Sequence, residues 1–237
     1  MGARRAGKTV LSQSIPGVEY FDCEVPSIRR MLRDPESFFR ERRSGPVVLD
    51  EIHRLDNPSE VLKLAADHFP KTKVIATGSS SLGASARFRD TLTGRKAEVL
   101  LTPMNAADLT DFACFDLKHR LRNGGLPPFF LADGFQEGDY QEWVDSYWAR
   151  DIQELFRLER RHSFQKFLEL LLVQSGGIFE ASSLAGPCEV SRTTIQDYLS
   201  ALEATFVVTV VRPYHTSRPV EIVAAHLGPV PRPNIFF

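Results

Sequence analysis

The chain has 237 residues, of which 43% are hydrophobic and 25% are charged, and this balance is typical of a globular protein. Its formal net charge of −1 gives no overall basic field of the kind that marks many nucleic-acid-binding proteins. No apolar run reaches the roughly 18 residues of a membrane span, and we expect no signal peptide. The widely spaced Cys23, Cys114 and Cys188 fit no metal or redox motif. We therefore expect a cytoplasmic protein without a membrane contact.

The chain opens with a phosphate-loop pattern, because Gly2, Gly7, Lys8 and Thr9 match G-x-x-x-x-G-K-[ST]. Small residues let the backbone N–H groups of such a loop approach phosphates closely, and the dipole of the following helix favours the same anion. We expect Lys8 to reach the terminal phosphates and Thr9 to bind Mg²⁺ through its hydroxyl. A chance match in a basic surface turn is the alternative. The residues predicted to hold the nucleotide are Gly2, Arg4, Arg5, Ala6, Gly7, Lys8, Thr9 and Val10.

The next segments alternate between helical and strand patterns. After a short helix in "KTVLSQSI", the β-branched and aromatic residues of Val18–Val25 predict a strand, and "SIRRMLRDPESFFRERR" predicts helix with a new start at Pro35. A continuous apolar run over Val47–Leu49 predicts a buried strand, "PSEVLKLAADHF" a helix, and Lys73–Leu82 a third strand. This order predicts an α/β fold with a parallel sheet.

Acidic and polar residues follow two of these strands. Asp50 ends the second strand, where a carboxylate can hold Mg²⁺, and Glu51 can take a proton from an attacking water. At the end of the third strand, Ser79 or Ser80 could orient that water or touch the γ-phosphate, with ordinary turn chemistry as the alternative. Arg95 is a candidate arginine finger for its own site or a neighbour's, and a solvated loop arginine is the alternative.

From about Leu109 the pattern becomes helical. Residues 109–120 predict a helix, "RNGGLPPFFLADGF" a connector, and residues 139–176 a mostly helical stretch. The segment "SSLAGPCEVSRTTIQDYLSALEAT" has helix-turn-helix form, in which Ser191 caps a helix and an apolar face follows; "FVVTVVRPY" predicts a wing strand. The outer face of the capped helix is only weakly basic, whereas DNA-binding helices usually carry more lysine and arginine. Packing within the protein or between subunits is therefore the alternative to DNA binding. The apolar face is predicted to consist of Ile195, Tyr198, Leu199 and Leu202, and the outer face of Arg192, Thr193, Gln196 and Asp197.

In this order, "GARRAGKT", "LDEIH", "TGSSS" and "GRKAEVLLTPM" resemble the motifs of a group of predicted ATPases of the AAA+ superfamily from bacteria and archaea. The resemblance continues through "GGLPPF", the Tyr147, Arg150 and Asp151 of a Y-x-x-R-D pattern, and the helix-turn-helix segment. It covers about residues 2–222 and implies ATP binding and hydrolysis with Mg²⁺. In that family a helical and winged-helix region follows the ATPase domain, and a nuclease-like region comes last.

The sequence departs from this family pattern at both ends. The family has a strand before the glycine loop, and it continues after "PVEIVAA" with a "PK-x-Y-x-x-D-x-G" segment that is replaced here by "HLGPVPRPNIFF". We interpret both ends as cut, by a wrong start site or by a frameshift near Ala225. The expected fold is a P-loop sheet lacking its first strand. We therefore expect residues 1–237 alone to bind ATP weakly or not at all, with a frayed segment at Met1–Arg5.

The sequence thus predicts four regions: an AAA+-like ATPase domain at 1–108, a helical region at 109–178, a winged-helix-like region at 179–215 and an irregular tail at 216–237. Three functions fit this organisation. The first is a Mg²⁺-dependent ATPase with Glu51 as the base; the second is a DNA-binding or regulatory module with a vestigial nucleotide site; the third is a non-functional gene fragment. Self-association is compatible with the first.

Overall fold

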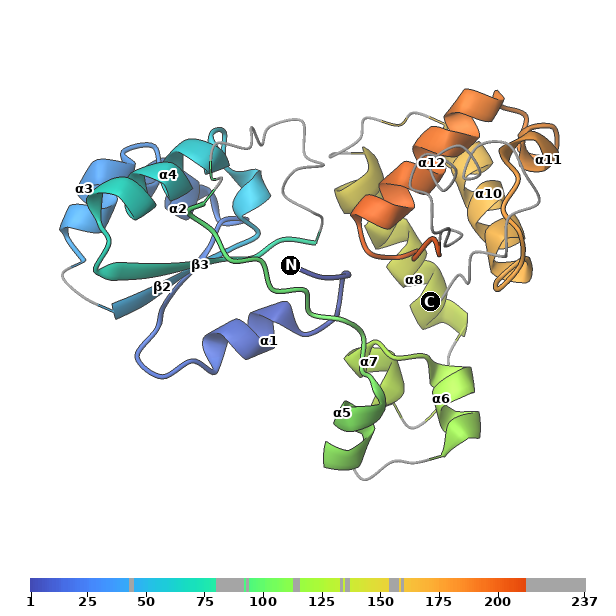
Figure 1. The fold of residues 1–237 in the computed structure, drawn as a ribbon, viewed down its shortest axis with the longest axis horizontal. Helices are drawn as coiled ribbons and strands as arrows, with labels where there is room; N and C mark the ends of the chain where they lie inside the picture. The colour runs from blue at the N-terminus through green and yellow to red at the C-terminus, as the bar shows by residue number, and fades with distance from the viewer. Residues whose placement is uncertain are drawn as a thin grey trace, which may run out of the picture. The chain divides into compact units, whose positions relative to one another are not determined.

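The computed structural model describes residues 1–42, 45–79, 92, 94–112, 116–132, 134, 137–153, 158 and 160–211. The chain divides into two compact units, Met1–Tyr147 and Trp148–Phe237 (Figure 1). Each unit is considered by itself below. No helix in the described part of the chain has both the length and the apolar character to cross a bilayer.

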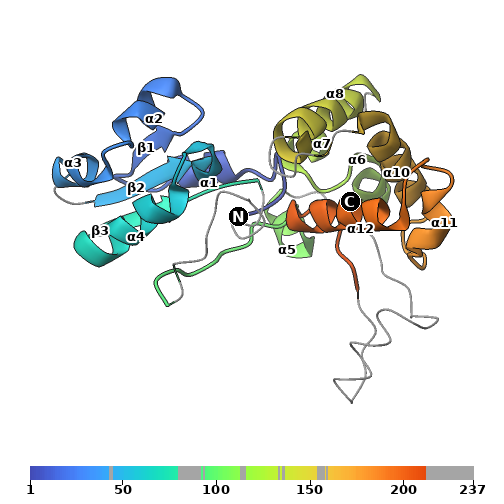
Figure 2. The same cartoon turned by 90° about the horizontal axis from the view of Figure 1, so that it is seen from above.

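A three-stranded parallel sheet forms the framework of the first unit, with its strands in the order β1-β2-β3 (Figure 2). The strands are β1 (Glu19–Asp22), β2 (Gly45–Asp50) and β3 (Thr72–Ala76). Asp22 pairs in register with Asp50, so β1 and β2 end at the same edge of the sheet. The alternation of strands and helices in the sequence predicted this α/β arrangement, and the prediction is confirmed.

Helices cover both faces of this sheet. Helix α1 (Lys8–Gln13) lies on one face, and α2 (Pro26–Met31), α3 (Pro35–Arg40) and α4 (Pro58–His68) lie on the other (Figure 1). Each of the last three helices has a proline in its first turn, where the missing N–H costs nothing because it has no partner within the helix. Proline therefore marks where these helices begin.

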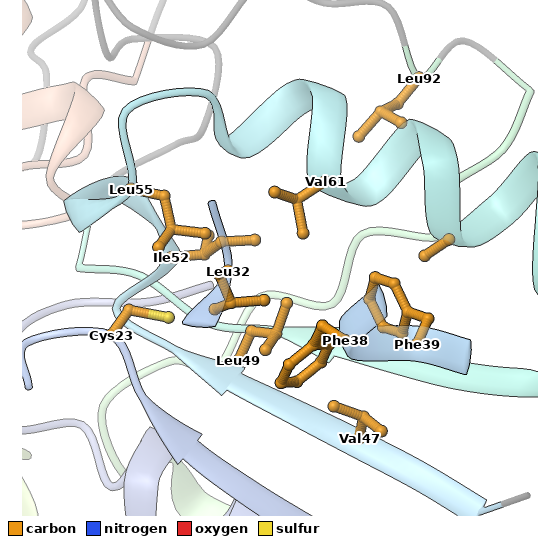
Figure 3. Packing of buried hydrophobic residues seen from close by; sticks show 11 residues of the cluster. Cys23, Leu32, Phe38, Phe39, Val47, Leu49, Ile52, Leu55, Val61 and Leu92 are labelled. Atoms are coloured by element: carbon orange, nitrogen blue, oxygen red, sulfur yellow. The ribbon is translucent and has the colours of Figure 1, made fainter. Parts of the chain in front are cut away.

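An apolar core lies between the sheet and α2, α3 and α4. Because side chains alternate across a strand, Val47 and Leu49 of β2 face these helices (Figure 3). The rings of Phe38 and Phe39 pack edge to face with centroids 5.0 Å apart. Burial of these side chains holds the sheet in register, since a one-residue slip would turn them to the other face. The buried members of the cluster are Cys23, Leu32, Phe38, Phe39, Val47, Leu49, Ile52, Leu55, Val61, Ala65 and Leu92.

Three expected elements differ in the structure. The third strand ends at Ala76, and the residues from 80 to 82 that were assigned to it lie outside the described part. The helix expected over 109–120 is two helices, α5 (Ala106–Asp111) and α6 (Leu117–Asn123). Asn105 and Asp116 cap them by accepting backbone N–H bonds, so each starts its own helix. The expected connector also contains a short helix, α7 (Pro127–Phe130).

The long helical stretch predicted over 139–176 is divided among several helices. In the first unit it gives α8 (Glu137–Tyr147). In the second unit it gives a π-helix (Trp148–Ile152) and α10 (Arg161–Val173). The second unit has an aromatic core. In it the ring of Phe164 packs edge to face on the ring of Tyr198, with a centroid distance of 5.2 Å.

Two further helices form the helix-turn-helix segment, α11 (Ala181–Ala185) and α12 (Arg192–Ala204) (Figure 2). The Ser191 hydroxyl accepts a hydrogen bond from the Thr194 N–H at 3.1 Å, which is the expected cap. Of the expected apolar face, Ile195, Tyr198 and Leu202 are buried and Leu199 is partly buried; the four residues of the outer face are exposed.

The described part of the expected wing contains no strand. Residues 206–211 form no strand, and residues 212–214 of the same segment lie outside the described part. Phe206 has a φ of 60°, in the left-handed region that is incompatible with an extended strand. Val207 and Val208 are instead buried directly after α12.

Candidate nucleotide-binding site

The glycine loop is a compact turn in front of α1. The Ala6 N–H donates to the Ala3 carbonyl at 3.2 Å, and Gly7 has a φ of 93°, a left-handed conformation that favours glycine. The Lys8 ammonium donates to the carbonyls of Gly2 and Ala3 at 2.9 and 2.8 Å. The loop therefore wraps around the lysine that the motif provides for phosphate.

Residues 99–101 hold the start of this loop. Gly2 forms a parallel bridge with Leu101, and the Leu101 N–H donates to the Met1 carbonyl at 2.7 Å. The Met1 amine donates to the Val99 carbonyl at 2.6 Å. A Cβ at Gly2 would collide with the Leu101 carbonyl, so this approach requires glycine. The start of the loop is thus paired, where the sequence predicts fraying.

A groove of about 690 Å³ adjoins this pairing. Val74 and Ala76 of β3 line it, as do Leu11 of α1, Ala65 of α4 and residues 95–99. Within the described residues β3 pairs only with β2, so the other edge of β3 faces this groove. The lining is mostly apolar, and it is continuous with the sheet.

Asp50 brings the loop and the sheet together. The residue is 3% exposed, and its carboxylate accepts hydrogen bonds from the hydroxyls of Thr9 (2.7 Å), Tyr20 (2.5 Å) and Thr77. Thr9 and Asp50 are 41 positions apart in the chain. The two residues that the sequence assigned to magnesium are therefore in contact.

Glu51 follows with an unusual backbone. Its φ of 51° is in the left-handed region, which costs a non-glycine residue on the order of 1 kcal/mol; such residues cluster at functional sites. Its N–H donates to the Thr77 hydroxyl at 3.3 Å, and its carboxylate lies 3.3 Å from Nδ1 of His53. The side chain is 22% exposed, so it is shielded without being closed off from solvent.

Two residues with hydroxyl groups at this site, Tyr20 and Thr77, were not predicted from the sequence. Tyr20 comes from β1, and its pKa is raised above the ordinary value by burial, by its hydrogen bond to Asp50 and by the charges of Asp50 and Asp22. Thr77 directly follows β3 and lies beside Asp50. A polar residue at the end of a strand next to the acidic strand was the available signal for Thr77; Tyr20 looked like an ordinary strand residue.

The other residues predicted to bind the nucleotide differ in their exposure and their partners. Ala6 and Ser79 are buried, whereas Val10 is 73% exposed. Arg4 is partly buried within the loop. Arg5 lies 3.4 Å from a carboxylate oxygen of Glu142. Ser80 lies outside the described residues.

Arg95 has a different partner from the one its predicted role requires. Its Nε donates to Oδ1 of Asp67 at 2.6 Å, and Asp67 belongs to the last turn of α4, directly before β3. The structure therefore pairs Arg95 with α4 and not with Asp50 or Glu51. Its role as an arginine finger stays a prediction.

Comparison with family models divides the chain into two matched segments. Residues 1–110 match a family described as an AAA domain. Residues 114–225 match a domain of unknown function, DUF8612.

Individual relatives extend over both segments. The uncharacterized proteins Rv2008c of Mycobacterium tuberculosis and Mb2031c of Mycobacterium bovis are each 30% identical to this chain over 222 residues. The similarity covers 90% of this chain but 49% of each relative, so the chain spans about half the length of the curated relatives it matches.

Solved structures of the RuvB Holliday junction branch migration motor of Thermotoga maritima align with 96% of this chain and 87% of theirs. The sequence identity is 15% and the TM-score is 0.40, which is too low to establish a common fold. The family match is the finding that bears on the first segment. Residues 1–110 of this chain are similar to an AAA domain.

Proposed function

We propose that the first unit binds ATP with Mg²⁺ and hydrolyses it. The observation that carries this proposal is the 2.7 Å hydrogen bond from Thr9, directly after the glycine loop, to Asp50 at the end of the buried acidic strand. Phosphate-loop hydrolases combine these two elements at one site. The match of residues 1–110 to an AAA domain supports the same function.

In this proposal the loop binds the phosphates. Gly2 and Gly7 keep the loop small enough for its backbone N–H groups to approach phosphate oxygens. Lys8 exchanges its bonds to the carbonyls of Gly2 and Ala3 for bonds to the terminal phosphates. Arg4 and Arg5 add positive charge beside them.

The residues at the acidic strand fit Mg²⁺. This ion prefers hard oxygen ligands, keeps several waters and takes further oxygens from nucleotide phosphates, so one or two protein groups suffice. Thr9 offers its hydroxyl, and Asp50 offers a buried carboxylate at 2.7 Å from it. Among the described residues, no three acidic, histidine or cysteine side chains are grouped so that they could hold a metal ion without further ligands. When bound, the ion would neutralise phosphate charge.

Glu51 is the proposed general base. Its carboxylate takes the proton from the water that attacks the terminal phosphorus, while the bond from phosphorus to the leaving diphosphate oxygen breaks. Nδ1 of His53 lies 3.3 Å from this carboxylate. Ser79 and an Arg95 from a neighbouring copy are further candidates for contacts to the γ-phosphate.

We expect Glu51→Gln to reduce ATP turnover by about 10²- to 10⁴-fold, because the amide cannot accept the proton. ATP binding should be retained, since Lys8, Thr9 and Asp50 are unchanged. Phosphate release and nucleotide affinity are measured side by side. Glu60→Gln, the same change at an exposed glutamate of α4, is the matched control. A Glu51→Gln protein that turns over ATP at the parent rate would contradict the role of Glu51.

DNA binding by α12 is the second candidate function. The cap at Ser191 and the buried face of the helix leave Arg192, Thr193 and Gln196 exposed on the outer side, as a recognition helix requires. Duplex binding that weakens steeply as salt is raised, and that Arg192→Ala reduces, would support it. Binding that does not respond to salt would count against it.

A further inference from the structure

Tyr20 makes a contact that none of the sequence motifs includes. Its hydroxyl donates a 2.5 Å hydrogen bond to Oδ2 of Asp50. The residue lies on β1 and pairs in register with Val48, while Asp22 pairs with Asp50. Because residues two apart on a strand share a face, Tyr20 and Asp50 are on the same side of the sheet, and the phenol extends along the strands to reach the carboxylate.

The two carboxylate oxygens of Asp50 have separate partners. Oδ1 accepts from the hydroxyl of Thr77, and Oδ2 accepts from the hydroxyls of Thr9 and Tyr20. These donors come from α1, from β1 and from the residue that directly follows β3. Rotation of the carboxylate would break bonds to all of them, so its orientation is fixed.

The Thr9 hydroxyl shows what this orientation provides. A hydroxyl has one proton and two lone pairs. The proton of Thr9 goes to Oδ2 of Asp50, so its lone pairs point elsewhere and are available to a metal ion. Tyr20 holds the same oxygen, Oδ2, from the side of β1.

We propose that Tyr20 is a positioning residue for the magnesium site: its hydroxyl holds Oδ2 of Asp50 toward Thr9, so that both oxygens are preorganised for Mg²⁺. This inference rests on the proposed function. The ring of Tyr20 fills space as a phenylalanine would, so the hydroxyl is the part that acts on Asp50. The effect should therefore appear in the Mg²⁺ dependence of nucleotide binding and not in binding as such.

The test compares ATP affinity in excess Mg²⁺ with ATP affinity in EDTA, measured with a fluorescent ATP analogue up to millimolar concentration on residues 1–237. The ratio of the two affinities is the gain due to Mg²⁺. We expect Tyr20→Phe to reduce this gain about ten-fold, the usual effect of losing a hydrogen bond to a charged group. Affinity in EDTA should stay within about two-fold of the parent value.

Phe21→Leu is the matched control, because Phe21 is the next residue of β1 but packs on Phe38 on the other face of the sheet. It should lower thermal stability and leave the Mg²⁺ gain unchanged. A Tyr20→Phe protein with the parent gain would overturn the inference alone, as would equal losses of affinity in Mg²⁺ and in EDTA. A parent chain without any gain from Mg²⁺ would overturn the proposed magnesium site, and this inference with it.

Discussion

An apolar β-strand added in front of Met1 is expected to raise the thermal midpoint of the first unit by roughly 10 °C and to strengthen MgATP binding. The reason is the groove of about 690 Å³ beside β3, which Val74, Ala76 and Leu11 help to line. Met1 and Gly2 already pair with residues 99–101 on one side of it. A strand that precedes Met1 would lie between residues 99–101 and β3.

The size of this effect follows from burial and hydrogen bonding. A strand in the groove would bury several aliphatic side chains at about 1.5–3 kcal/mol each, set against the entropy of ordering them. It would also pair backbone groups along the edge of β3. The total stability of a domain is only about 5–15 kcal/mol, so such a gain is a large fraction of it. Nucleotide binding gains because the added strand enters the glycine loop directly and fixes it.

Thermal unfolding and hydrogen exchange of the β3 amides measure this gain. The control is an extension of equal length made of glycine and serine, which lengthens the chain without apolar burial. The amides of Val74 and Ala76 should become more protected from hydrogen exchange with the apolar extension and not with the glycine-serine extension. If both extensions gave the same stability and the same protection, the groove would not be a site for a strand.

Lys8→Ala is expected to abolish nucleotide binding. The Lys8 ammonium is the cation that the loop encloses, and phosphates bound there would lose the charge that neutralises them. Lys8→Arg keeps the positive charge but changes the shape of the side chain. Comparing it with Lys8→Ala separates the effect of charge from the effect of shape. Lys63→Ala, at an exposed position of α4, removes a positive charge elsewhere in the same unit. Unchanged ATP affinity in Lys8→Ala would show that the glycine pattern is not a phosphate loop.

Much of the fold of the first unit could be predicted from the sequence, because its signals are local. The unbroken apolar run of β2 marked a strand buried on both faces, and Pro35 and Pro58 stood at the expected starts of helices. The capping residue Ser191 marked α12 in the same way. In each case one short segment contains the whole signal.

Two other elements were missed. Asn105 and Asp116 each cap a helix of their own, and a periodicity extended over residues 109–120 hides this division. The aromatic and β-branched residues after α12 favoured a strand by propensity, yet Phe206 turns and Val207 and Val208 are buried instead.

The candidate site shows the same division. Lys8, Thr9, Asp50 and Glu51 were predicted because their residue types and order form motifs, and the structure places Thr9 on Asp50. Tyr20 has no such signature: only the register of β1 against β2 shows that its hydroxyl reaches the carboxylate.

The central claim, that the glycine loop and Asp50 form one MgATP site, is tested most directly by isothermal titration of MgATP. Three proteins are compared: residues 1–237, the same chain with the apolar extension, and the extended chain with Lys8→Ala. We predict saturable micromolar binding by the extended chain, weaker binding in the millimolar range by residues 1–237, and no binding by the Lys8→Ala variant. Equal affinity of the extended chain and its Lys8→Ala variant, or no binding by any of the three, would contradict the claim; micromolar binding by residues 1–237 would show that the strand is not needed.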